Sequence, residues 1–291
     1  MSQLIFNVLF STSVYLLVSI SFISTYYPAK FFNLAHGAII SLGAYFAYMF
    51  SKQLSLPIFV SIILSIILAT IFGLLIYKTI FKPLRNNKTN NYILLLTSLG
   101  VYIIIVNCIS LIWGSDAKTL RFFSIQVGHK LLGAYITNSQ LIIMVGSIIL
   151  FVGSLFISKY SKIGIRIRAI SENEDLANIL GLSSNKIILW AFVIGSILAS
   201  IAGILLGIES TFSPLTGFRL LLYGIVAMII GGVGSIRGLI VGSLLLATAQ
   251  NLGAYYIDSK WMDAIAYMIL ILFLIWKPLG FSGRRLKKVE L

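Results

Sequence analysis

Few side chains in this sequence could do chemistry. Its histidines are His36 and His129 and its one cysteine is Cys108, three positions far apart in the chain. Metal sites and nucleophile–base pairs need several such groups close together, so we predict no catalytic residue, no metal site and no cofactor. The sequence also lacks a GxxxxGK[ST] phosphate-binding loop. If the protein works with ATP, another chain must hydrolyse it.

The composition explains this scarcity, because the chain is suited to lipid. Of its 291 residues, 59% are hydrophobic and 10% are charged, against roughly 25% charged in a soluble domain. A spanning helix needs about 20 apolar residues and satisfies its own backbone hydrogen bonds. We therefore predict an all-α fold: residues 1–291 form one polytopic transmembrane helical bundle with about 8–9 spans, some of them short or broken.

Apolar runs give the expected positions of these spans. They are residues 3–24, 34–51, 56–77, 92–113, 139–158, 187–208, 219–232, 238–252 and 262–277. The two runs 219–232 and 238–252 flank a glycine-rich turn and are short, so we expect half-helices or tilted spans there.

Basic residues indicate an orientation. The formal net charge is +14, which in a soluble protein would suggest nucleic acid, but in a membrane protein lysine and arginine gather in cytoplasmic loops. We therefore predict no nucleic-acid partner. One side of the bundle would keep only Lys52, Lys118, Arg121, Lys130, Arg219 and Lys260 of the 22 basic residues. That side is expected to be outside, with the N-terminus, and the C-terminus is expected to be cytoplasmic.

Charged residues are absent from the middle of every predicted span. Glu209, Arg219 and Asp263 all fall near span ends. Carriers driven by protons or sodium usually need an ionisable group inside the membrane. An ion-coupled secondary carrier is therefore the less favoured alternative.

The cytoplasmic loop at 159–186 contains a candidate docking segment. Ser171 with Glu174 three residues later matches a capping box, and Gly181 is placed to end a short helix. An apolar stripe would face one side, and so short a helix needs a surface to pack on, either its own membrane domain or a partner protein. The candidate residues are Arg168, Ala169, Ser171, Glu172, Glu174, Asp175, Leu176, Ala177, Ile179, Leu180 and Gly181.

Two polar or flexible segments are candidates for a translocation pathway. One is Asn33, His36 and Gly37 at the start of the second span, where a helix cap is the favoured alternative. The other is the glycine-rich turn, where tight helix packing is the alternative. Its candidate residues are Gly231, Gly232, Gly234 and Ser235. Gly195, Ala199, Gly203 and Gly207 form a small-residue ridge in the sixth span and predict close helix packing.

Three blocks together resemble a known family. They are residues 33–37 followed by 41–45, residues 168–181, and residues 231–236 before Gly238. In order and spacing they are similar to the branched-chain amino acid ABC-transporter permeases, and the length resembles the smaller of the two paired permeases. Arg237 departs from this pattern, because many members carry proline there.

The resemblance implies a function and a set of partners. The chain would be a permease subunit with a fold like that of type II ABC importers, in a bacterial cytoplasmic membrane. Two ABC ATPase subunits, a second homologous permease and an extracytoplasmic substrate-binding protein would be its partners, and the segment from Arg168 to Gly181 would meet the ATPases. A urea or short-amide permease is the alternative within the same architecture.

Overall fold

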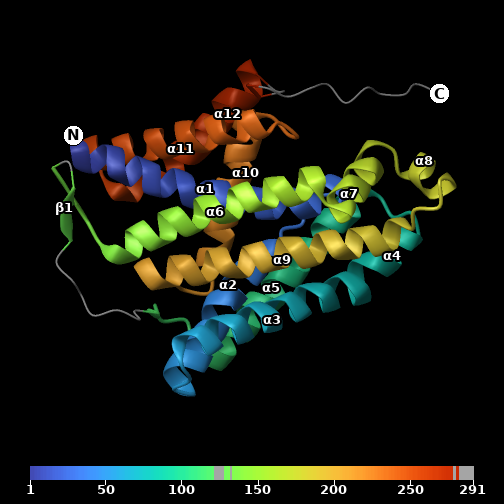
Figure 1. Ribbon diagram of the computed structural model, residues 1–291, viewed down its shortest axis with the longest axis horizontal. Helices are drawn as coiled ribbons and strands as arrows, with labels where there is room; N and C mark the ends of the chain where they lie inside the picture. Colours follow the sequence, from blue (N-terminus) through green and yellow to red (C-terminus); the bar gives the residue numbers. More distant parts are fainter. Residues whose placement is uncertain (121–127, 132, 278–279, 282–291) are drawn as a thin grey trace.

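The protein is a bundle of long helices that run side by side (Figure 1). Its computed structural model describes residues 1–120, 128–131, 133–277 and 280–281. Within these residues, 7 helices are long and apolar enough to cross a membrane. They are Ser2–Ala29, Ile58–Asn86, Asn91–Trp113, Asn138–Tyr160, Ser184–Glu209, Ile236–Tyr256 and Ser259–Trp276. The polytopic helical fold predicted from composition is confirmed.

The remaining two predicted spans are shorter helices inside the bundle. They are α2 (His36–Tyr48), continued by the π-helix η1 (Met49–Gln53), and α10 (Thr216–Gly231). Nearly every residue of α2 is buried, and α10 is mostly buried. Short helices are tolerated at membrane depth where other helices surround them, so both are interior elements.

Burial separates central from peripheral helices. In the most apolar windows of α1 (Ser2–Ala29) and α9 (Ser184–Glu209), 61% and 67% of residues are buried. The corresponding share is 17% for α6 (Asn138–Tyr160) and 6% for the window ending in α12 (Met262–Trp276). Helices whose apolar side chains remain this exposed are suited to face lipid.

The small-residue ridge of α9 packs as predicted. A Cβ added at Gly203 would overlap the carbonyl oxygen of Ile40 in α2, and one at Gly195 would lie 3.0 Å from the Ser21 carbonyl oxygen in α1. Reciprocally, a Cβ on Gly43 of α2 would lie 2.5 Å from the Ser200 carbonyl oxygen in α9. Glycine therefore allows the backbones of these three helices to touch.

The third span is longer than predicted. We expected it to end at residue 77, but α3 (Ile58–Ile76) continues through the π-helix η2 (Tyr77–Phe81) into α4 (Lys82–Asn86). Pro83 does not break it, because it lies in the first turn of α4, where a missing backbone N–H is tolerated. Helix α5 (Asn91–Trp113) follows.

The segment between α5 and α6 contains a small hairpin. Strand β1 (His129–Leu131) pairs antiparallel with β2 (Ala134–Ile136), with His129 opposite Ile136. Gln3 holds this hairpin to the start of α1, because its Oε1 accepts a hydrogen bond of 2.9 Å from the Tyr135 backbone N–H. Arg121, counted above among the external basic residues, lies outside the described residues.

The charged residues near span ends have partners in the structure. Arg219 in α10 lies 3.5 Å from Asp263 in α12, and Tyr223 donates a hydrogen bond to the same carboxylate. Glu209 accepts hydrogen bonds from Ser139 and Gln140 at the start of α6. These pairings tie helix ends together and leave the span centres uncharged.

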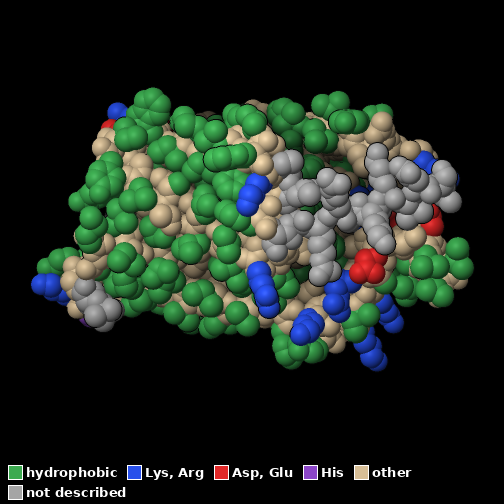
Figure 2. Space-filling model, turned by 90° about the horizontal axis from the view of Figure 1, so that it is seen from above, with side chains coloured by type: hydrophobic (Ala, Val, Ile, Leu, Met, Phe, Trp, Pro, Cys, Tyr) green, Lys and Arg blue, Asp and Glu red, His purple; other side chains and the backbone are tan. Residues whose placement is uncertain are grey.

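Two helices outside the spans mark one end of the bundle. They are α7 (Lys162–Glu172) and α8 (Glu174–Ile179), which lie at the opposite end from the hairpin (Figure 1). We call these the α8 end and the β1 end. Hydrophobic side chains cover most of the surface between them, and most of the visible lysine and arginine side chains lie toward the α8 end (Figure 2). Helix α11 (Ile236–Tyr256) and the short 3-10 helix η3 (Ser259–Trp261) complete the elements.

Candidate functional site

The docking segment consists of two helices rather than one. We expected Ser171 to cap a single helix, but Ser171 lies inside α7 and donates to the Ile167 carbonyl oxygen at 2.7 Å. The helix is interrupted at Asn173, where the backbone is extended. The Asn173 Oδ1 accepts a 2.9 Å hydrogen bond from the Leu176 N–H. Asparagine is as good a cap as serine, and here it takes that role at the start of α8. The predicted capping box is wrong.

Gly181 ends α8 as the sequence predicted. Its φ is +85°, in the left-handed region that glycine adopts without strain. The Gly181 N–H donates to the Asn178 carbonyl, and the Leu182 N–H donates to the Ala177 carbonyl, both at 3.0 Å. These bonds satisfy carbonyls at the helix end and turn the chain back toward α9.

The apolar stripe of α8 is exposed. Leu176 is 54% exposed, Ile179 82% and Leu180 73%, whereas Ala177 is 3% exposed and packs with Ile170 and Ile187. In the described residues, this stripe therefore does not pack against its own membrane domain, which was the alternative. An unpartnered row of three large aliphatic side chains outside the spans is suited to bind a protein surface.

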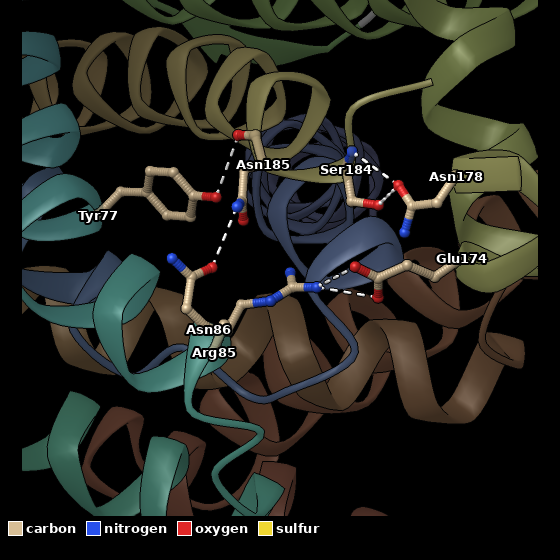
Figure 3. A network of polar contacts seen from close by, with 7 residues as sticks. All are labelled: Tyr77, Arg85, Asn86, Glu174, Asn178, Ser184 and Asn185. Atoms are coloured by element: carbon tan, nitrogen blue, oxygen red, sulfur yellow. Dashed lines mark hydrogen bonds and ion pairs between the residues drawn. The ribbon is translucent and has the colours of Figure 1, made fainter. Parts of the chain in front are cut away.

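Polar contacts attach α8 to two other helices (Figure 3). Arg85 of α4 donates from Nη2 to both carboxylate oxygens of Glu174, at 2.8 and 2.9 Å. On the other side, the Asn178 Oδ1 accepts from the Ser184 hydroxyl at 2.5 Å and from its backbone N–H at 3.2 Å. The helix therefore lies between the end of the third span and the start of α9.

Two further hydrogen bonds join those neighbours directly. The Tyr77 hydroxyl donates to the Asn185 carbonyl at 3.2 Å, and the Asn185 side chain donates to the Asn86 Oδ1 at 3.0 Å. Each bond connects the third span to α9 across the base of the docking segment (Figure 3). The α8 end is thus one polar network built from α4, α8 and α9.

The first group of candidate pathway residues is buried. Asn33 is 5% exposed and His36 1%, and a Cβ on Gly37 would lie 3.0 Å from the Phe218 Cα of α10. The His36 Nε2 lies 3.1 Å from the Ser21 hydroxyl of α1. The favoured alternative, a side-chain cap of α2, is wrong, because Ala35 is the N-cap residue and Asn33 contributes its backbone carbonyl to the His36 N–H.

The glycine-rich turn combines tight packing with an open side. A Cβ on Gly231 would overlap the Gly238 carbonyl, so glycines let α10 and α11 meet. Gly232 and Gly234 have φ of 94° and 92°, and the Ser235 hydroxyl accepts from the Gly238 N–H at 3.1 Å as the cap of α11. Arg237 is the second residue of α11 and is exposed.

The turn and the docking segment meet at one crevice. Gly234 and Ser235 line it together with Arg168 of α7, Tyr27 of α1 and Ser158 of α6. Asn33, His36 and Gly37 are not among its lining residues. The structure therefore brings one group of candidate pathway residues next to the candidate docking residues and leaves the other group packed in the core.

Comparison with known proteins places this architecture in a family. Residues 4–274 match the family described as "Branched-chain amino acid transport system / permease component". The chain belongs to this family of permeases. It is 30% identical to the high-affinity branched-chain amino acid transport system permease protein LivH of Escherichia coli (strain K12), with 97% of this chain and 95% of that protein covered.

Other relatives agree with this assignment. The permease is 33% identical to BraD, a high-affinity branched-chain amino acid transport system permease protein of Pseudomonas aeruginosa, over 97% of this chain and 95% of that one. A xylose transport system permease protein, XylH of Haemophilus influenzae, is 30% identical over only 43% of this chain and 35% of its own length. The permease is therefore a membrane component of a transport system. Separately, its described residues contain no group of three or more metal-binding side chains.

Sequence reasoning missed the permease residue that anchors α8. Sequence alone assigned Arg85 no individual role, because it is one of four basic residues after the predicted third span, with Lys78, Lys82 and Lys88. The signal that could have indicated an ion pair was the acidic start of α8 facing a basic segment. Sequence could not choose among four cations, because the choice depends on the unpredicted continuation of the third span through η2.

Proposed function

We propose that this permease is the membrane-spanning subunit of an ATP-binding-cassette importer for branched-chain amino acids. It would receive substrate from an extracytoplasmic binding protein and form the pathway with a second, homologous permease. Two separate ATPase subunits would hydrolyse ATP, since the sequence contains no phosphate-binding loop of its own. The names of the relatives support the substrate class.

The exposed apolar stripe of α8 carries the proposal that the permease binds the ATPases. Leu176, Ile179 and Leu180 stand out from the α8 end on a short helix held on two sides. A helix of this kind inserts into a groove of its partner by its apolar residues. The α8 end is then cytoplasmic and the β1 end extracytoplasmic, in agreement with the basic residues near α7 and α8.

Alternating access would follow from this attachment. ATP binding closes the ATPases, α7 and α8 move with them, and the bundle opens the pathway toward one side or the other. Gly234 and Ser235, which share a crevice with Arg168, are our candidates for residues along the moving region. His36 and Gly37 are better explained by packing between α1, α2 and α10.

The experiment that tests this function is leucine uptake by the complete complex in proteoliposomes. Wild-type uptake should require ATP in the compartment that contains the ATPases and should persist when ion gradients are dissipated. Leu180→Asp should abolish uptake and binding-protein-stimulated ATPase activity, because a charge on the stripe cannot enter an apolar groove. Leu180→Met should keep both. Uptake that collapses with the ion gradient, or normal coupling in Leu180→Asp, would refute the proposal, and transport of urea in place of leucine would refute the substrate class.

A further inference from the structure

Helix α8 needs an anchor of its own. It has only 6 residues, and an isolated helix of this length is unstable in water. Its contact with α9 through Asn178 and Ser184 joins residues that are 6 apart in sequence, so it shapes the local turn. Its contact with α4 joins residues that are 89 apart. The Arg85–Glu174 pair is therefore a long-range link between α8 and the membrane bundle, beside the packing of Ala177 on Ile170 and Ile187.

Only one of the two terminal guanidinium nitrogens of Arg85 binds Glu174. Arg85 is 12% exposed and Glu174 40%, so the cation is the fixed, enclosed member. Both hydrogen bonds come from Nη2, while Nη1 is buried and has no hydrogen-bond partner among the described residues. A guanidinium can hold a carboxylate through one nitrogen or through two. The structure shows the arrangement through one nitrogen, and the unpaired Nη1 leaves a second donor on Arg85 for a shifted carboxylate.

Arg85 is also well placed to pass a movement onward. It lies in α4, which continues through η2 into α3 as one helix of 29 residues, Ile58–Asn86. On the same continuous helix, Tyr77 and Asn86 are hydrogen-bonded to Asn185 of α9 (Figure 3). A displacement of Glu174 therefore acts on the end of a membrane-spanning helix rather than on a loop.

We propose that Arg85 and Glu174 are a positioning pair that transmits movement of α8 to the third spanning helix. The inference rests on the proposed function, because α8 must be moved by a partner ATPase. In it, the stripe of α8 binds the partner, and the ion pair converts that movement into a movement of the helix Ile58–Asn86. Without the pair, ATP would still be hydrolysed but would drive less transport.

The test is the number of leucine molecules imported per ATP hydrolysed by the reconstituted complex. For Arg85→Gln, which lies outside the docking segment, we expect normal assembly with the ATPases and near-normal ATP hydrolysis, because the apolar stripe is intact. Glu174→Gln is judged by its ratio of leucine to ATP alone. The ratio of leucine to ATP should fall by about fivefold or more, as for loss of a coupling interaction. The exchanged pair Arg85→Glu with Glu174→Arg should recover most of the ratio, because it restores attraction between the two helices.

A control and the contrary outcomes separate this inference from the function on which it rests. Lys82→Gln removes an exposed cation from the same helix α4 and should leave the ratio unchanged. If the wild-type complex imports leucine with ATP but both single variants keep its ratio, the pair has no coupling role. A low ratio in the exchanged pair, with assembly intact, would likewise refute it. If the wild-type complex shows no ATP-dependent import, the proposed function fails and the positioning role fails with it.

Discussion

Asn173 shows how one side chain sets the form of the docking segment. It separates α7 from α8 by an extended backbone and caps α8 with its own Oδ1. The carboxylates of Glu174 and Asp175 then occupy the first turn of α8, where negative charge interacts favourably with the helix dipole. The orientation of α8, and hence of its exposed stripe, depends on this cap.

Replacing Asn173 tests this role. Asn173→Ala should destabilise α8 by about 1 kcal/mol, as for loss of an N-cap. Hydrogen exchange at the amides of residues 176–179 should become faster, while exchange in α9 should not change. Asn173→Asp, whose carboxylate can accept the same bond, is the matched control and should exchange like the wild type. Unaltered exchange in Asn173→Ala would mean that the cap does not hold the helix.

At the scale of elements, close backbone contacts at glycines bring the central helices together. Gly203 in α9 faces Ile40 of α2, and Gly43 in α2 faces Ser200 of α9. Other helical glycines have open space, among them Gly100 in α5 and Gly153 in α6. A glycine in these helices therefore matters where another helix approaches it closely, and has no such role where the space beside it is open.

This difference gives a matched set of variants. Gly203→Ala should destabilise the permease by about 1–3 kcal/mol, the usual cost of overpacking, because backbone atoms must move apart. Thermal unfolding in detergent, followed by loss of monodispersity, should occur at a lower temperature. Gly100→Ala and Gly153→Ala should unfold at the wild-type temperature or slightly above it. Equal midpoints for all three variants would contradict close contact between α2 and α9.

Sequence predicted the elements better than their connections. Apolar runs located the spans, and spacing identified the ridge of α9, because hydropathy and glycine intervals are local properties. The capping residue of α8 was misassigned, because Ser171 and Asn173 are equally good caps and tertiary contacts decide between them. Continuation of α3 through a π-helix, and thus the place of Arg85, depends on packing that no local pattern records.

At the scale of the whole molecule, the two ends of the bundle are built from different structural elements. The β1 end has a hairpin fastened to the start of α1, and the α8 end has two helices, a crevice and the Arg85–Glu174 pair. Such asymmetry is expected of a chain that meets different partners on the two sides of a membrane. The orientation that we infer, with the α8 end in the cytoplasm, follows from the distribution of lysine and arginine.

Labelling of single cysteines tests this orientation. In a Cys108→Ser background, which removes the exposed native thiol, Lys130→Cys in β1 should react with a membrane-impermeant maleimide added to intact spheroplasts. Leu180→Cys should react only after the membrane is permeabilised. The two positions are exposed at opposite ends of the bundle. The reverse labelling pattern would show that the topology is inverted, and cytoplasmic ATPases could then not bind at the α8 end.

The enclosed position of α2 also has a consequence for how the chain is made. Helix α2 packs on α9, and the Ser41 hydroxyl donates to the Pro214 carbonyl at 2.8 Å. The chain reaches this carbonyl late in synthesis, since Ser41 and Pro214 are 173 residues apart. During translation, α2 lies beside lipid or the insertion machinery before its partners are made, and the Ser41 hydroxyl then lacks its Pro214 acceptor. The first half of the permease therefore completes its fold only when the ribosome has passed α10.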